Sequence, residues 1–468
     1  MSDDLAFTSA TELLSLYRAK KVSPIEATKA ALSRIERFNP KLNAYCLIDA
    51  EGALASAKQS EARWMAGAPK GLIDGVPASV KDIILTKGWP TLRGSKTVDP
   101  KGPWNDDAPA TARLRENGAV ILGKTTTPEF GWKGVTDSPL TGVTRNPWNL
   151  DRTPGGSSGG ASAAVAAGMG QLAIGTDGGG SIRIPAAFTG IFGIKPNFGR
   201  VPAWPLSPFG TVAHLGPMTR NVADGALMLN VLAQPDARDW FSLPYEGTDW
   251  TRHLGRGVKG LKVAFSPTLG FAKVDPEVAE LVQRAVRAFA ELGAHVEEVT
   301  RIFDDPTPVF WTHWLVGAFN GLGALPPEKR AMLDPGLRRS VEEGERIGLK
   351  QFLDAVNARG RLGAEMRLFH TRYDLLLTPS LALPAFPVGK LAPLSTNRPE
   401  DWIGWTPFTY PFNLSQQPAA TVPCGFTGEG LPAGLQIVGP MHREDLVFAA
   451  AQAYETAHPT TAKRPPIA

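Results

Sequence analysis

Residues 155–183 read GGSSGGASAAVAAGMGQLAIGTDGGGSIR, and this stretch decides how the whole chain is interpreted. Ten of the 26 residues from 155 to 180 are glycine, against 49 of 468 in the full sequence. A flexible linker can be equally rich in glycine and serine, but a linker is solvated. Here Asp177 is the only charged residue between Thr153 and Ile182. The stretch is therefore expected to be buried, where glycine lets the backbone approach a bound group closely.

Two kinds of bound group could require such a backbone. A nucleotide phosphate is disfavoured, because the sequence has neither GxxxxGK[ST] nor a GxGxxG motif that follows a strand. A reacting carbonyl fits better, because the N–H groups of Gly178, Gly179 and Gly180 directly precede the hydroxyl of Ser181. An oxyanion hole needs backbone donors beside the nucleophile, and glycine permits the unusual dihedral angles involved.

A second serine motif competes with Ser181 for the role of nucleophile. Residues 155–159 match the GxSxG elbow with Ser157 at the centre, and an overlapping match is centred on Ser158. An elbow needs a strand immediately before it. Residues 145–154 contain two prolines and two asparagines, which a central strand disfavours. The elbow interpretation therefore lacks its structural context.

A serine nucleophile needs a base, because its hydroxyl is a weak nucleophile at neutral pH. Of the seven histidines only His214 is hard to dismiss, and a hydrogen-bonded structural role is favoured for it. A lysine can serve instead if burial lowers its pKa. Lys81 stands in VPASVKDII, residues 76–84, and lysine in such an apolar, strand-like context is unusual. An edge lysine with its head in water fits this context equally well.

Helix-like and strand-like segments alternate along the rest of the chain, which predicts an α/β architecture with a largely parallel or mixed sheet. Ser23 and Pro24 predict a helix start, and Asn39-Pro40 a helix end. Helix-like segments at 111–117 and 276–292 are followed by strand-like segments at 119–122 and 295–299. The short apolar runs 375–377, 420–422 and 435–438 are strand-like as well, and all of these strands are expected to be buried. We expect one large domain over residues 1–468, with a helical region at 1–68 and a helical insertion over one face at 305–370.

Composition narrows the possible partners. The 49 basic and 45 acidic residues leave a net charge of +4, too small for a nucleic-acid stripe or a membrane-surface patch. Cys46 and Cys424 are the only cysteines, which excludes a disulfide scaffold and suits a reducing compartment. No spacing indicates a metal site, and no run of 18 apolar residues indicates a membrane span. We expect a cytoplasmic protein without metal or cofactor.

Taken together, these residues resemble the amidase signature family. The glycine- and serine-rich stretch and the separation of 24 residues between Ser157 and Ser181 agree with the family pattern, and Lys81 in SVKD matches its catalytic lysine. The flanking motifs that also match are GKT at 123–125, RNPW at 145–148, GIKP at 193–196, VPCG at 422–425 and GLQIVG at 434–439. The resemblance covers about residues 10 to 457 and is most specific in the middle third.

The resemblance implies a Ser–cisSer–Lys triad within one α/β domain built around a mixed sheet of roughly eleven strands. Ser181 would be the nucleophile, Ser157 the bridging serine after a cis peptide bond, and Lys81 the neutral base. The N–H groups of Gly178, Gly179, Gly180 and Ser181 would hold the oxyanion.

The surroundings of this triad allow more than one interpretation. Trp132 matches a position that lines the acyl pocket in relatives, and Trp405 and Phe408 are expected to do likewise, with core packing an equal alternative for each. Asp177 and Arg183 flank the nucleophile. A structural ion pair is favoured for them over a carboxylate clamp formed by Arg183.

The expected activity is hydrolysis of a small, apolar or aromatic carboxylic amide through a Ser181 acyl-enzyme, with release of ammonia or an amine. An alternative is the glutamine-hydrolysing subunit of a tRNA-dependent amidotransferase. That subunit usually carries a Ser-Ala-Gly-Tyr-Tyr-Asp segment, whereas residues 348–354 here read GLKQFLD. A non-catalytic binding module is disfavoured by the intact Lys81, Ser157 and Ser181. Relatives are often homodimers, but no surface pattern in the sequence indicates the oligomeric state.

Overall fold

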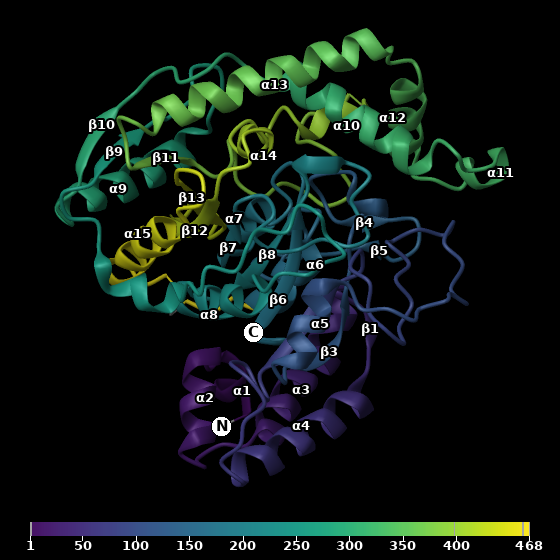
Figure 1. The fold of residues 1–468 in the computed structure, drawn as a ribbon, viewed down its shortest axis with the longest axis vertical. Helices are drawn as coiled ribbons and strands as arrows, with labels where there is room; N and C mark the ends of the chain where they lie inside the picture. Colours follow the sequence, from purple (N-terminus) through teal and green to yellow (C-terminus); the bar gives the residue numbers. More distant parts are fainter. Residues whose placement is uncertain (1, 397, 461–462, 468) are drawn as a thin grey trace.

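A mixed sheet of eleven strands forms the centre of the computed structural model, which describes residues 2–396, 398–460 and 463–467 (Figure 1). From one edge to the other the strands are β1 (Tyr45–Ile48), β3 (Val120–Thr125), β2 (Pro77–Lys81), β6 (Leu172–Asp177), β8 (His214–Thr219), β7 (Phe192–Lys195), β12 (Ala419–Phe426), β13 (Pro432–Val438), β11 (Leu375–Pro379), β9 (Lys262–Phe265) and β10 (His295–Glu298). Strands β3, β2 and β6 run parallel, as do β11, β9 and β10, and the other pairs are antiparallel. The predicted single α/β domain with a mixed sheet is confirmed.

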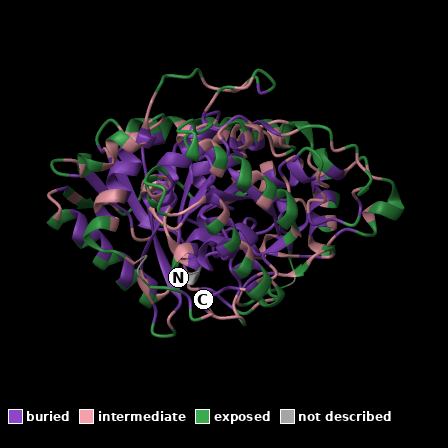
Figure 2. Ribbon diagram, turned by 90° about the horizontal axis from the view of Figure 1, so that it is seen from below, coloured by how far each residue is buried: buried purple, intermediate pink, exposed green. Residues whose placement is uncertain are grey.

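Helices cover both faces of this sheet. One face packs against α5 (Pro109–Glu116), α8 (Val222–Leu232), α9 (Pro276–Glu291) and α15 (Glu444–Ala457). The other face packs against α6 (Gly159–Ala166) and α7 (Arg183–Thr189). In Figure 2 the sheet and the inner sides of the helices are buried, and exposed residues follow the rim. The interior is therefore divided by the sheet into two apolar layers.

The alternation of side chains along β2 decides where Lys81 points. Ala78 and Val80 belong to the apolar layer beneath α5 and α8. Successive side chains of a strand point to opposite faces, so Ser79 and Lys81 project toward the side of α6. Because β2 lies between β3 and β6, the alternative of an edge lysine with a solvated head is excluded.

The N-terminal region contains α1 (Ser2–Phe7), α2 (Ala10–Arg18), α3 (Pro24–Leu42) and α4 (Ala50–Met65). A capping box in which Ser23 and Glu26 bond each other's backbone N–H groups confirms the predicted start of α3. The predicted end at Asn39-Pro40 is wrong, because α3 runs through Pro40 and ends where Asn43 adopts a left-handed conformation. The region 1–68 is also not wholly helical, since it supplies the edge strand β1.

At the opposite end of the molecule, residues 305–370 form four helices (Figure 1). They are α10 (Thr307–Leu322), α11 (Pro327–Arg330), α12 (Pro335–Glu345) and α13 (Leu349–Phe369). They follow β10, which was expected to be a buried strand from 295 onward. That expectation is wrong, because β10 is the edge strand and the side chains of His295, Glu297 and Glu298 are exposed.

Short elements complete the fold. They are the ribbon β4 (Asp137–Ser138) and β5 (Gly142–Val143), the helix α14 (Pro411–Leu414), and the 3-10 helices η1 (Glu129–Gly131), η2 (Gly210–Val212), η3 (Trp250–Arg256) and η4 (Pro399–Trp402). An ion pair of 3.1 Å between Arg464 and Asp4 joins the two ends of the chain.

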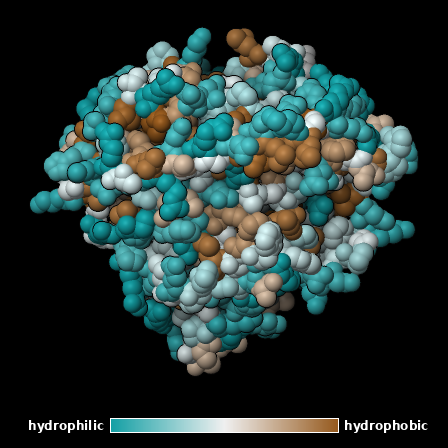
Figure 3. All heavy atoms as spheres, turned by 45° about the horizontal axis from the view of Figure 1, so that its top comes forward, coloured by the Kyte–Doolittle hydropathy of each residue, from teal (hydrophilic) through white to brown (hydrophobic). Residues whose placement is uncertain are grey.

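The face shown in Figure 3 is mostly hydrophilic. Figure 3 shows one face, on which apolar side chains form several separate patches among polar ones. Within the described residues, no helix combines the length and the apolar composition that a membrane crossing requires.

Candidate active site

Lys81 lies at the end of β2 and is fully buried. Its Nζ lies 2.7 Å from Ser157 Oγ, 3.0 Å from Ser158 Oγ and 2.7 Å from Thr176 Oγ1. Burial lowers the pKa of Lys81 well below its ordinary value, and the charge of Asp177 offsets this only in part. Among the described residues, the amine has three hydroxyls and no carboxylate as hydrogen-bond partners, so its neutral form is favoured.

The hydroxyl hydrogen of Ser158 is donated to a backbone oxygen, and this determines which atom is the donor in the contact between Ser158 and Lys81. Ser158 Oγ donates to the carbonyl oxygen of Thr176 at 3.2 Å and accepts the N–H of the same residue at 3.2 Å. The contact with Ser158 must therefore be donated by Lys81 Nζ. A neutral amine has two N–H donors and one lone pair. The lone pair is thus available to accept a proton from the Ser157 or the Thr176 hydroxyl.

The peptide bond between Gly156 and Ser157 is cis, as the family resemblance implied. No strand comes immediately before it, because residues 145–156 form turns, isolated β-bridges and irregular backbone, and the elbow interpretation of Ser157 is therefore wrong. Ser157 and Ser181 both line one cavity. Within the described residues no direct hydrogen bond joins their two hydroxyls. Such contacts often tighten only when a substrate is bound.

The backbone of residues 178–181 offers fewer free donors than the sequence indicated. The N–H of Gly180 donates to Asp177 Oδ1 at 2.8 Å, so Gly180 is a support of the loop rather than a free oxyanion donor. The N–H groups of Gly178, Gly179 and Ser181 make no hydrogen bond with any described residue. Gly180 has a φ of +126° and a Cβ there would lie 2.4 Å from Thr409 Oγ1, so this position requires glycine.

Asp177 and Arg183 form a fully buried ion pair, with Arg183 Nη2 2.9 Å and Nε 3.0 Å from the carboxylate oxygens. The guanidinium also donates to Gln436 Oε1, Thr409 O and Asn413 Oδ1. Burial alone would raise the pKa of Asp177, but Arg183 and Asn413 hold it below its usual range. The structural interpretation of this pair is confirmed. All the partners of Arg183 lie inside the fold, so the alternative in which Arg183 binds a carboxylate of the substrate is wrong.

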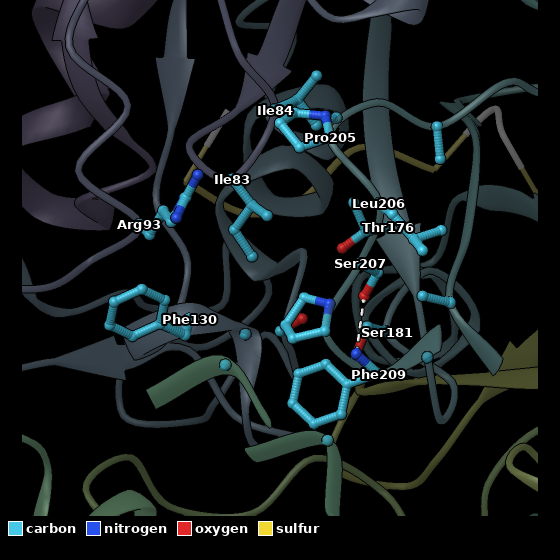
Figure 4. Close-up of a pocket in the computed structure, with 18 of the residues that line it drawn as sticks. Ile83, Ile84, Arg93, Phe130, Thr176, Ser181, Pro205, Leu206, Ser207 and Phe209 are labelled. Atoms are coloured by element: carbon cyan, nitrogen blue, oxygen red, sulfur yellow. Dashed lines mark hydrogen bonds between the residues drawn. The ribbon is translucent and has the colours of Figure 1, made fainter. Parts of the chain in front are cut away.

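The cavity that reaches Ser181 has a volume of about 450 Å³. Its walls come from the turn after β2, from residues 203–209, from β8 and from helix α10 (Figure 4). Phe209 stacks on Trp314 of α10 with ring centroids 4.2 Å apart. The larger apolar side chains of the lining are Ile83, Ile84, Leu85, Phe130, Trp204, Leu206, Phe209, Leu215, Trp314, Leu322 and Leu337. The volume is in the range of small-molecule sites.

The three aromatic residues predicted to contact the substrate lie outside this lining. Trp405 stacks on Phe188 within the aromatic layer, and Phe408 is fully buried there. Trp132 lines a different surface pocket and accepts the indole N–H of Trp314 through its carbonyl oxygen at 3.0 Å. Their contact with a substrate stays a prediction. Core packing accounts for the positions observed.

Three residues of the site carried little signal in the sequence. Thr176 touches the base but was distinguished only by its place in the glycine-rich stretch. Trp314 belongs to a generic helical region and reaches the cavity only through folding. Arg93 lines the cavity from the loop after β2 and matches no motif quoted above.

His214 also lines the cavity, from the start of β8. Its Nδ1 lies 2.8 Å from the carbonyl oxygen of Val212, and its Nε2 is buried without a hydrogen-bond partner in the described part of the chain. Burial and then Lys195 lower the pKa of His214 well below its ordinary value. The ring is thus neutral, with Nδ1 as donor and Nε2 as a vacant acceptor. The described residues contain no group of three metal-ligating side chains.

Comparison with known proteins agrees with this geometry. The sequence pattern of the Amidase family matches residues 26–448. The chain is 39% identical to an acylamidase of Rhodococcus erythropolis over 99% of this chain and 98% of the relative. It is 35% identical to a glutamyl-tRNA(Gln) amidotransferase subunit of Myxococcus xanthus over 96% of each chain. The crystal structure of a bacterial aryl acylamidase of the amidase signature family superposes with a TM-score of 0.90 at 35% identity, over 97% of this chain and 96% of the other.

Proposed function

Because the chain belongs to the amidase signature family and is a hydrolase acting on amide bonds, we propose that it cleaves small apolar or aromatic carboxylic amides through a Ser181 acyl-enzyme. The observation that carries the proposal is the buried amine of Lys81, held by hydroxyls beside a largely apolar cavity that contains Ser181. A neutral buried lysine can act as a base where an exposed, charged one cannot.

The proposed reaction begins when Ser181 Oγ attacks the amide carbonyl. Its proton passes to Ser157 Oγ as the proton of Ser157 passes to Lys81 Nζ. The N–H groups of Gly178, Gly179 and Ser181 hold the negative oxygen of the tetrahedral intermediate. Ser157 then donates a proton to the leaving nitrogen and recovers one from Lys81 as the C–N bond breaks. Water, deprotonated along the same relay, hydrolyses the ester and frees Ser181.

The choice of an apolar or aromatic substrate rests on the lining of the cavity. Phe209, Trp314 and Phe130 offer aromatic surface, and the isoleucine and leucine side chains of the lining are also apolar. Burying apolar substrate surface contributes about 25 cal/mol per Å². The names of two relatives, an acylamidase and an aryl acylamidase, support the same class of substrate.

A covalent probe and a panel of amides test the proposal together. We expect a small fluorophosphonate to label Ser181, as located by peptide mass spectrometry, and labelling to slow sharply in Lys81→Met. We also expect the purified chain to release aniline or ammonia from simple anilides and primary amides. Labelling of Ser157 or Ser158 instead of Ser181 would contradict the assigned roles.

The amidotransferase relatives support a second candidate function, that of a glutamine-hydrolysing subunit. A glutaminase subunit would release ammonia from glutamine only within its complex, whereas the proposed amidase acts as a purified single chain. The replacement of the Ser-Ala-Gly-Tyr-Tyr-Asp segment by residues 348–354 favours the amidase. Inactivity on every anilide, combined with turnover of glutamine in the presence of partner subunits, would reverse this preference.

A further inference from the structure

Arg93 is the one charged side chain among the described residues that line the cavity of Ser181. It is half-buried, and the labelled side chains nearest to it in Figure 4, Ile83 and Phe130, are apolar. Figure 4 shows Arg93 and Phe130 on the far side of the cavity from Ser181 and Thr176, with Ile83 between them in this view. The guanidinium therefore lies away from the position of the scissile bond.

Among the described residues, Asp82 is the carboxylate whose charge acts on this guanidinium, and it offsets the cost of burial only in part. In the part of the chain that the structure describes, the guanidinium makes no hydrogen bond and no ion pair, and Asp82 is paired with Lys124 Nζ at 3.0 Å. Burial lowers the pKa of Arg93 from its ordinary value. A partly buried cation without a partner is unfavourable unless a ligand supplies the missing charge.

The backbone at Arg93 gives no reason for an arginine. Its φ is +57°, in the left-handed region that favours glycine, and the next residue, Gly94, has a φ of +63°. The carbonyl oxygen of Arg93 accepts the N–H of Phe130 at 2.8 Å, which any residue could do. A long cationic side chain is thus placed where the turn itself disfavours it, and it faces the cavity.

We propose that Arg93 binds a carboxylate of the substrate, at the end remote from the amide bond that Ser181 attacks. A planar guanidinium can hold a carboxylate through two parallel hydrogen bonds. The inference rests on the proposed function and narrows it to amides with an apolar body and one distant acidic group. Arg93 would thus bind the carboxylate that the sequence analysis considered for Arg183. Arg183 itself is paired with Asp177 inside the fold.

Matched substrate pairs test the anchor on either side of the amide. One pair is 4-anilino-4-oxobutanoate and N-phenyl-4-methylpentanamide, in which an isopropyl group replaces the carboxylate on the acyl side. The other is 4-acetamidobenzoate and N-(4-isopropylphenyl)acetamide, with the same replacement on the leaving group. In at least one pair we expect Arg93→Met to lower kcat/KM for the carboxylate at least about tenfold more than for its partner.

Two further variants serve as controls. Arg93→Lys keeps the charge without the planar fork, and we expect it to recover part of the preference for the carboxylate. Arg284→Met removes an exposed charge on α9, outside the cavity, and should leave both pairs unchanged. Equal losses on both members of each pair in Arg93→Met would overturn the anchor.

Binding separates this inference from the proposed function. In Ser181→Ala, calorimetry with 4-anilino-4-oxobutanoate and 4-acetamidobenzoate should detect an affinity for one of them that Arg93→Met abolishes. If the protein hydrolyses the neutral anilides but shows no preference or binding that depends on Arg93, the proposed amidase function stands and the carboxylate-binding role of Arg93 is wrong. Arg93-dependent binding without hydrolysis of any anilide by the unmodified protein would keep the anchor and remove the proposed substrate class.

Discussion

Two buried lysines lie near the ends of adjacent parallel strands, and only one of them is arranged as a base. Lys81 of β2 and Lys124 of β3 are both fully buried, and burial lowers the pKa of each. Lys124 forms an ion pair with Asp82 and donates to the backbone oxygens of Ile84 and Pro90. Lys81 contacts three hydroxyls instead. A lysine next to a carboxylate keeps its proton and holds a loop, whereas a lysine among hydroxyls can give its proton up.

The largest effect is expected from removing the hydroxyl-bound amine. Lys81→Met should lower kcat/KM for amides roughly 10⁴-fold, the upper end for a general base, because the relay through Ser157 then has no acceptor. The fold should persist, since no charge is left unpaired. Circular dichroism and thermal unfolding provide the control. A variant that retains more than about one tenth of the activity would mean that another group is the base.

Removing the carboxylate of Asp82 should make the buried Lys124 destabilise the fold. Asp82→Asn leaves Lys124 buried without its counter-charge, which should cost about 3 kcal/mol of unfolding free energy. Urea unfolding followed by fluorescence measures this loss. The double variant Asp82→Asn with Lys124→Met removes the unpaired charge and should recover part of it. If the single variant is as stable as the unmodified protein, the pair does not hold this loop.

The pH dependence should report Lys81 and not Lys124. The base must be neutral, so kcat/KM should fall about tenfold for each pH unit below the pKa of Lys81 and be constant above it. Burial lowers the pKa of Lys81 well below 10.5, so the rise of kcat/KM with pH should end well below the pH at which an ordinary lysine loses its proton. The lowered pKa of His214 predicts no separate transition near pH 6.5. If the pH profile of kcat/KM shows a transition near pH 6.5 that disappears in His214→Gln, the assignment of Lys81 as the base is contradicted.

The smallest effect is expected from one hydroxyl of the set around Lys81. Thr176→Val replaces the hydroxyl 2.7 Å from Lys81 Nζ with a methyl group of similar size. One hydrogen bond of this kind contributes about 0.5–1.5 kcal/mol, so kcat/KM should fall roughly three- to tenfold. Thr91→Val makes the matched change beside Lys124, where Nζ also bonds a threonine hydroxyl, and should leave kcat/KM nearly unchanged.

Much of the site could be inferred from the sequence because its key residues lie in short motifs. The stretch 155–183 holds Ser157, Ser158, Ser181 and the Asp177–Arg183 pair, and its lack of charge predicted its burial. The number of strands and the cis peptide bond followed from the family resemblance. The end of α3 was missed because a proline within the last turn gives up a single N–H, while Asn43 supplies the cap.

The remaining features depend on the folded conformation, and most of them on contacts between segments far apart in the chain. The sequence by itself determined the chemical groups, the alternation that turns Lys81 away from one face of the sheet, and the glycines that leave backbone N–H groups free. Only the tertiary structure decided which hydroxyls surround that amine, that Asp177 takes the N–H of Gly180, and that Arg93 and Trp314 meet in one cavity. The reason is physical: backbone conformation follows from neighbouring residues, whereas burial, and with it the pKa of a lysine, follows from what folding brings around it.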